Sequence, residues 1–120
     1  MNSGVLVSIP DKDTNDFLIK MLTNEENWKA WTGGRKSSNT WSWLDGTEFT
    51  FTMWDEPQQP DNAGGNENNL EIWHSGFWND APENTPRAFI CQNIPSNGQR
   101  SAKQPDDITV YERVCHLGWC

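Results

Sequence analysis

The stretch of residues 55–69 most constrains what this chain can fold into, because it can form neither a regular helix nor a regular strand. It holds two prolines, a glycine pair, amides and acids, and almost no apolar side chain. Prolines and glycines interrupt regular structure, and a loop this long in a chain of 120 residues is usually functional or disordered. We therefore expect a long irregular loop between two groups of regular elements.

Before the loop, the sequence predicts a strand and then a helix. Residues 4–9 alternate and are rich in branched side chains, which is typical of a strand, and Pro10 ends the pattern. A helix is expected next, because Asp11 or Asp13 can cap its first turn and apolar residues recur at helical spacing. These apolar residues form one stripe, which we assign to the core: Phe17, Leu18, Met21 and Leu22.

From Trp28 onward the apolar residues follow the period of strands. Short strands are expected at residues 28–31, 41–43, 49–53, 70–73, 77–78 and 88–91. Residues 95–107 are polar and rich in breakers, which predicts a linker or disorder, and residues 108–120 receive no assignment. The expected organisation is one domain over residues 1–94 and a linker-like or disordered tail of unknown role over residues 95–120.

The charge of the chain excludes several classes of partner. A formal net charge of -8 works against binding to nucleic acid and to anionic lipid surfaces, which are themselves negative. No run of about 18 to 20 apolar residues is present, so insertion into a membrane is not expected. The first four residues lack the basic and apolar segments of an export signal.

The cysteines do not form a metal-binding pattern. Cys91, Cys115 and Cys120 lack metal-ligand spacing with the two histidines, His74 and His116, and an odd number leaves at least one cysteine unpaired within the chain.

Oxygen-bearing side chains gather in the loop and just after a later strand. They are Gln59, Asp61, Glu67, Asn79 and Asp80. Three are carboxylates, which repel one another when crowded unless a cation lies between them, and calcium prefers such oxygen ligands. A cis bond between Gln59 and Pro60 would turn the side chains of Gln59 and Asp61 toward one point. The alternative is a solvated acidic loop without a ligand.

The order of these motifs resembles that of the C-type lectin-like family over roughly residues 4–93. The motifs that carry the resemblance are Trp31-Thr32-Gly33, Trp41-Ser42-Trp43, Asp45-Gly46, Trp54, Gln59-Pro60-Asp61, Glu67-Asn68, Trp78-Asn79-Asp80 and Phe89-Ile90-Cys91. The fold that the resemblance implies is α+β, with a helix packed beside small antiparallel sheets and a long calcium-binding loop.

The resemblance also implies a function for the loop residues. Gln59, Asp61, Glu67, Asn79 and Asp80 stand at the positions of the family's sugar-site calcium ligands, and the first four would also contact the sugar. The order Gln-Pro-Asp resembles members that bind galactose or N-acetylgalactosamine. Glu56-Pro57-Gln58 resembles the Glu-Pro-Asn triplet of mannose-type members, but Asp61 lies six residues before Glu67, as the family pattern requires, and Gln58 lies nine before it.

Aromatic residues near the expected site are candidates for stacking on a sugar. They are Trp73, His74 and Phe77. Core packing is an equally good interpretation for Trp73 and Phe77, and His74 fits a surface position. No aromatic residue directly follows Asp61, which weakens the galactose assignment. Trp31 and Trp78 are assigned to the core, because large rings allow a small loop-rich domain to bury area with few residues.

Several family features are missing. The disulfide that closes the loop region in the family would require cysteines where Asn69 and Glu83 stand. The first strand, the first helix and the family partner of Cys91 would precede Met1, so the domain looks truncated at its front and Cys91 is expected to pair with Cys115 or Cys120. Lys36 and Thr40 stand where a second calcium site would need acids, so one ion is expected.

The expected activity is calcium-dependent carbohydrate binding without catalysis, since no Ser-His-Asp, Cys-His or zinc-ligand spacing is present. Two alternatives are a mannose-type or calcium-only member, and a fold relative that binds protein or ice without the sugar site. The resemblance implies a secreted, extracellular protein, and an oligomer would give such a lectin avidity.

Overall fold

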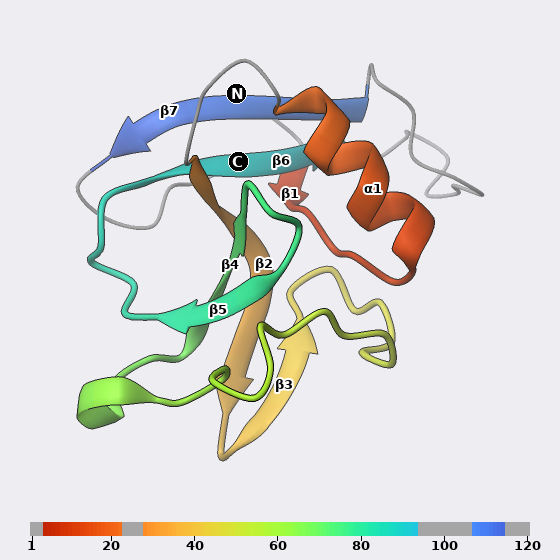
Figure 1. Cartoon of the computed structure of the whole chain (residues 1–120). Helices are drawn as coiled ribbons and strands as arrows, with labels where there is room; N and C mark the ends of the chain where they lie inside the picture. Colours follow the sequence, from red (N-terminus) through yellow and green to blue (C-terminus); the bar gives the residue numbers. More distant parts are fainter. Residues whose placement is uncertain (1–3, 23–27, 94–106, 115–120) are drawn as a thin grey trace.

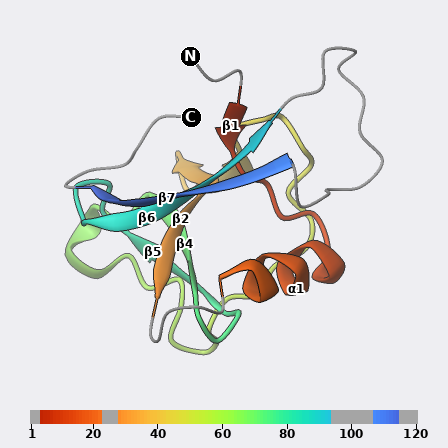
Figure 2. The same cartoon turned by 90° about the horizontal axis from the view of Figure 1, so that it is seen from above.

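A computed structural model of the chain describes residues 4–22, 28–93 and 107–114. Its elements are β1 (Gly4–Leu6), α1 (Lys12–Met21), β2 (Lys29–Ser37), β3 (Thr40–Trp43), the short 3-10 turn η1 (Ala63–Gly65), β4 (Asn69–Trp73), β5 (Trp78–Ala81), β6 (Arg87–Asn93) and β7 (Ile108–Val114). The helix lies beside the sheet, and the loop with η1 lies on the opposite side of the molecule (Figures 1 and 2). Within the described ranges, no helix is long and apolar enough to cross a membrane.

The strands form one mixed sheet of seven strands in the order β1-β6-β2-β4-β5, with β3 paired to β2 and β7 paired to β6. One antiparallel group contains β2, β3, β4 and β5, and a second contains β1, β6 and β7. A short parallel pairing, Ala30 with Ala88 and Trp31 with Phe89, joins the two groups. The predicted combination of one helix with small antiparallel sheets is confirmed, and the parallel link makes the sheets continuous.

The helix forms as the sequence predicts and is tied to the sheet by an asparagine. Asp11 is its N-cap, and the carboxylate accepts a hydrogen bond from the backbone N–H of Thr14 at 2.8 Å. Leu18 is fully buried. Asn15, also fully buried, accepts from the indole Nε1 of Trp78 at 2.8 Å and donates to the carbonyl of Gly76 at 2.9 Å. Both ends of this amide therefore hold α1 against the β4–β5 hairpin.

The glycine pair expected to follow a short strand lies inside β2. A Cβ atom at Gly33 would lie 2.6 Å from the carbonyl oxygen of Leu6, and one at Gly34 would lie 2.7 Å from the Cβ of Leu70. Only glycine allows the neighbouring chains to come this close, and the register of β2 with β4 shifts at the same place, between Trp31 and Arg35. The strand consequently continues to Ser37.

The ring of Trp78 is the centre of the core. It is fully buried, as is Trp31, so both core assignments are confirmed. Four aromatic rings meet the Trp78 ring edge-on at centroid distances of 5.6 to 6.2 Å: Trp43, Phe49, Phe51 and Trp54. The prediction of a strand at residues 49–53 is wrong, because this segment forms no ladder of hydrogen bonds with another strand and its alternate rings pack on Trp78 instead.

Strand β7 lies in the tail that the sequence left unassigned. It pairs antiparallel with β6, from Gln92 with Ile108 to Arg87 with Val114. Ile108 is 6% exposed and belongs to the main core cluster, and the Tyr111 ring stacks on Phe89 at 4.9 Å. The tail thus supplies an edge strand. Cys115 and Cys120, the two candidate partners of Cys91, lie outside the described residues.

Candidate metal and sugar site

The start of the long loop is fixed against β5 by backbone hydrogen bonds. The N–H of Trp78 donates to the carbonyl of Met53 at 2.8 Å, and the N–H of Asp55 donates to the carbonyl of Trp78 at 3.1 Å. The packing of Trp54 on Trp78 adds an aromatic contact at the same place. Because Asn79 and Asp80 directly follow Trp78, the loop begins beside these two polar residues.

Asp80 then fastens the middle of the loop. Its side chain is fully buried, and its two oxygens accept the backbone N–H groups of Asp61 at 3.1 Å and Asn62 at 2.7 Å. Charge-assisted hydrogen bonds of this kind compensate part of the cost of burying a carboxylate. The sequence-predicted residues Asp61 and Asp80 are therefore neighbours in space.

The loop turns back so that Glu67 faces the same place. Asn62 has a φ of 48° and its side-chain oxygen accepts the N–H of Glu67 at 3.0 Å. Gly64 and Gly65 follow with φ values of 79° and 81°, a conformation that favours glycine. The N–H of Ala63 donates to the carboxylates of Asp61 at 3.2 Å and Glu67 at 2.9 Å. The turn therefore brings both carboxylates to one N–H group.

The three carboxylates form a compact acidic cluster. Asp61, Glu67 and Asp80 each offer an oxygen within 4.8 Å of those of the other two. Loss of hydration and the hydrogen bond that protonated Glu67 donates to Asp61, together with the charges of Asp80 and Asp61, raise the pKa of Glu67 to about 7. The raised pKa means that ionising Glu67 beside the other two carboxylates is energetically unfavourable.

Two amides complete the group. The surroundings of Gln59 favour the orientation in which its amide nitrogen faces three acceptors: Asp80 Oδ1 at 3.1 Å, Asp61 Oδ1 at 3.1 Å and Asn79 Oδ1 at 2.6 Å. The structure thus brings together all five residues that the sequence singled out. The Gln59–Pro60 peptide bond is cis, as expected. Glu56 and Gln58, the ends of the competing triplet, are exposed in the turn that precedes this group.

A buried ionic network is connected to the acidic cluster through Asn79, and the sequence pattern did not predict it. Glu71, in the middle of β4, is 1% exposed. Its Oε1 accepts from Arg87 Nε at 2.6 Å, and its Oε2 accepts from Trp73 Nε1 and Asn79 Nδ2, both at 2.8 Å. Glu71 appears in sequence only as the polar position of an alternating strand, so its burial depends on neighbours that the sequence does not place.

The three aromatic residues considered for stacking on a sugar differ in burial and in contacts. Trp73 is half-buried, its indole nitrogen is bound to Glu71, and Lys29 Nζ lies 5.2 Å from the centroid of its ring. His74 and Phe77 are exposed in the hairpin that joins β4 to β5. Trp73 is the candidate that a hydrogen-bond network connects to the site.

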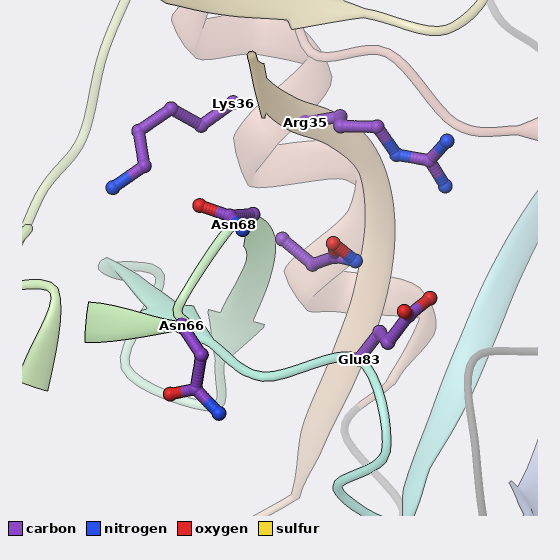
Figure 3. Close-up of a pocket in the computed structure, with 6 residues that line it drawn as sticks. Arg35, Lys36, Asn66, Asn68 and Glu83 are labelled. Atoms are coloured by element: carbon purple, nitrogen blue, oxygen red, sulfur yellow. The ribbon is translucent and has the colours of Figure 1, made fainter. Parts of the chain in front are cut away.

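A separate cavity of about 250 Å³ is lined partly by the two residues that flank Glu67 in sequence, Asn66 and Asn68 (Figure 3). It is lined by Arg35, Lys36, Asn66, Asn68, Asn69 and Glu83. Figure 3 shows Arg35 and Lys36 pointing in opposite directions, so their charges do not converge on one point. The cavity includes Asn69 and Glu83, where the sequence comparison predicts the cysteines of the family disulfide, and Lys36, where it predicts an acid of a second calcium site.

The cluster has the donors that a calcium ion requires. Calcium binds six to eight oxygen atoms from carboxylates, amide carbonyls, backbone carbonyls and water. The three carboxylates match this preference, and the Asn79 amide oxygen beside them is a ligand of the same kind. The Gln59 amide, whose nitrogen faces these acceptors, would have to turn to present its oxygen to an ion. These five residues include no sulfur or imidazole ligand that would favour zinc or copper. The acidic cluster can hold a metal ion, with the other ligands supplied by water or by a bound hydroxyl group.

Comparison with known proteins gives a consistent result. Residues 1–93 match the profile of the Lectin C-type domain. The chain is 32% identical to chicken (Gallus gallus) hepatic lectin over 89 residues, which is 72% of this chain and 42% of that protein. It is 32% identical over 87 residues to asialoglycoprotein receptor 2 of Rattus norvegicus, covering 67% of this chain and 28% of the receptor. The chain therefore spans less than half the length of these two relatives.

A solved structure supports the same relationship. The fold is similar to that of the mouse scavenger receptor C-type lectin carbohydrate-recognition domain, with a TM-score of 0.66 and 28% identity over 74% of this chain and 71% of that domain. The family profile covers more than half of the sequence, and the relatives and the fold agree with it. On this evidence, the chain belongs to the C-type lectin domain family.

Proposed function

We propose that this chain binds carbohydrate through a calcium ion held by Gln59, Asp61, Glu67, Asn79 and Asp80. The observation that carries the proposal is the cluster of Asp61, Glu67 and Asp80, whose carboxylate oxygens lie within 4.8 Å of one another. Gln59 contacts two of these carboxylates and Asn79, so all five side chains belong to one connected group. C-type lectin domains generally bind calcium, and two relatives are named as a hepatic lectin and as a receptor for asialoglycoprotein.

The chain's own side chains would perform recognition, and no bond of the ligand would be broken. Two neighbouring hydroxyl groups of a sugar could take the remaining positions around the ion. Each hydroxyl group can both donate and accept a hydrogen bond, whereas the carboxylates only accept and the amides present both functions. The proposed site therefore selects a sugar by the positions of two adjacent hydroxyl groups.

We propose galactose or N-acetylgalactosamine as the sugar class. The order Gln59-Pro60-Asp61 resembles galactose-binding members of the family. This register is supported by the contacts of Gln59 and Asp61 with Asp80, whereas Glu56 and Gln58 are exposed. Galactose has an apolar face, and the half-buried ring of Trp73 is the aromatic group tied to the same site through Glu71.

The proposal also covers the extent of the domain, its location, its disulfide and its oligomeric state. Residues 1–94 form the lectin unit, to which the tail over residues 95–120 adds strand β7. An extracellular location, a disulfide from Cys91 to the tail and oligomerisation that adds avidity are further parts of the proposal, and they rest on family resemblance.

Calorimetry tests the function directly. Calcium is titrated into protein stripped of divalent ions, then galactose and mannose are titrated in turn, and the series is repeated with chelator. We expect calcium binding, a sugar signal that requires calcium, and a preference for galactose. A preference for mannose would reject the sugar class, and sugar binding that survives chelation would reject the role of the ion. Absence of calcium binding would reject the function.

A further inference from the structure

Glu71 lies at a point where three strands contribute hydrogen-bond donors to one buried carboxylate. In the sheet it is paired with Trp31 of β2 on one side and with Asn79 of β5 on the other. Arg87 of β6 reaches its Oε1 at 2.6 Å, and the Arg87 side chain is 23% exposed. The carboxylate is thus buried and neutralised by a partner that itself reaches water.

The contact with Glu71 fixes which end of the Asn79 amide faces the acidic cluster. An ionised carboxylate can only accept, so it selects the nitrogen of the amide. Asn79 Nδ2 donates to Glu71 Oε2 at 2.8 Å, and the opposite end, Oδ1, lies 2.6 Å from the Gln59 amide nitrogen. The oxygen of Asn79 therefore points into the group of five side chains. Without Glu71, the amide could rotate by half a turn and present N–H groups there.

The same carboxylate oxygen holds the aromatic candidate. Trp73 Nε1 also donates to Glu71 Oε2 at 2.8 Å, so the indole edge and the Asn79 amide meet at a single atom. Trp73 and Glu71 are two residues apart in β4 and share one face of the strand. A displacement of the Glu71 carboxylate would therefore move both the Asn79 amide and the Trp73 ring.

We propose that the Glu71–Arg87 pair is a positioning pair for carbohydrate recognition: it keeps the oxygen of Asn79 directed at the metal site and sets the Trp73 ring beside it. The metal-binding part of this inference rests on the proposed function, whereas the orientation of Asn79 does not depend on it. Outer groups of this kind, which orient metal ligands, commonly change metal affinity by about 10–100-fold when replaced.

The central test replaces Glu71 with glutamine, which keeps the shape but removes the charge and the exclusive acceptor character. We expect Glu71→Gln to fold, because Arg87 can turn its charge toward water. The calcium dissociation constant should rise about 10–100-fold. The matched control is Glu48→Gln, which makes the same chemical change at an exposed position and should leave calcium affinity at the wild-type value. Equal affinities in the two variants would overturn the proposal.

A second measurement needs neither calcium nor a variant. In the calcium-free wild-type protein, NMR should show slow hydrogen exchange for the Asn79 side-chain amide, compared with the exposed Asn84 as internal reference. If the Asn79 amide exchanges as fast as that of Asn84, the positioning role is excluded, even if Glu71→Gln fails to fold. If Asn79 is protected but the wild-type protein binds no calcium, the positioning stands and the proposed function fails.

Discussion

The buried carboxylate of Asp80 accepts a hydrogen bond from the backbone N–H of Asn62 at 2.7 Å, across 18 positions of sequence. Its other oxygen accepts from the N–H of Asp61. One side chain therefore anchors the loop and also belongs to the acidic cluster, which gives Asp80 two roles that experiment can separate.

Replacing Asp80 should remove calcium binding and loosen the loop at the same time. Hydrogen bonds to charged groups contribute about 1.5–3 kcal/mol each, so Asp80→Ala should expose the N–H groups of Asp61 and Asn62 to exchange. Hydrogen exchange followed by NMR measures this. Asp61→Ala is the matched control: it should weaken calcium binding while the backbone N–H of Asn62 stays protected by Asp80. Unchanged exchange in Asp80→Ala would show that the loop is held by other contacts.

Calcium affinity should depend on pH through Glu67. Its pKa is raised from 4.5 to about 7, so at about pH 5.5 the protonated group must lose its proton before it binds a cation. Calorimetry at about pH 5.5 and about pH 8 should therefore show weaker binding at the lower pH. Glu67→Gln should bind more weakly at both values, and its affinity should change less between them. Wild-type affinity that is flat over this range would contradict the prediction.

The stability of the calcium-free protein should change with pH in the opposite direction. Because the folded pKa of Glu67 lies above 4.5, the folded state binds the proton more tightly than the unfolded chain does. The resulting stabilisation is fully present below 4.5 and is lost as the pH rises through about 7. Urea unfolding in chelator should show this loss, and Glu67→Gln should not. A loss of equal size in the variant would assign the effect to other groups.

Asn15, which is buried in α1, should contribute more to the free energy of unfolding than an exposed residue of the same helix. Asn15→Ala leaves the buried Nε1 of Trp78 without its acceptor, and an unsatisfied buried donor costs about 1–3 kcal/mol. Asp13→Ala, in the exposed first turn of the same helix, should cost only a few tenths of a kcal/mol up to about 1 kcal/mol. Chemical denaturation measures both. Similar costs in the two variants would mean that Asn15 does not tie α1 to Trp78.

The sequence was most informative where residue type alone limits the chemistry. Three carboxylates and two amides in and after a proline-containing loop left two interpretations open, a cation site and a solvated acidic loop, and the motif order then favoured the cation site. Glu71 and Asn15 escaped prediction for a common reason. Each looks like an ordinary polar residue of an amphipathic element, and each is buried only because a partner distant in sequence covers it.

Two other differences between the predicted and the observed strands arise from strand pairing, which the local pattern of residues does not determine. Residues 49–53 alternate like a strand, but the rings of Phe49 and Phe51 pack on Trp78, and the segment bonds to β5 only at Met53. Residues 108–111, which read Ile-Thr-Val-Tyr, do find a partner, β6, although a polar segment precedes them. Alternation therefore predicts an extended chain with one buried face, and the sheet edges decide whether it becomes a strand.

The role of the tail can be tested by two substitutions in β7. Ile108 is 6% exposed and packs in the main core, whereas Val110 is 37% exposed. Ile108→Ala should lower the free energy of unfolding by about 2–5 kcal/mol, as is usual when a buried isoleucine is truncated. Val110→Ala should cost less than about 1 kcal/mol, because little buried surface is lost. Urea denaturation measures both values. A tail that is only a linker would make the two substitutions equally harmless, so the difference between them decides whether the lectin unit ends at residue 94 or includes β7.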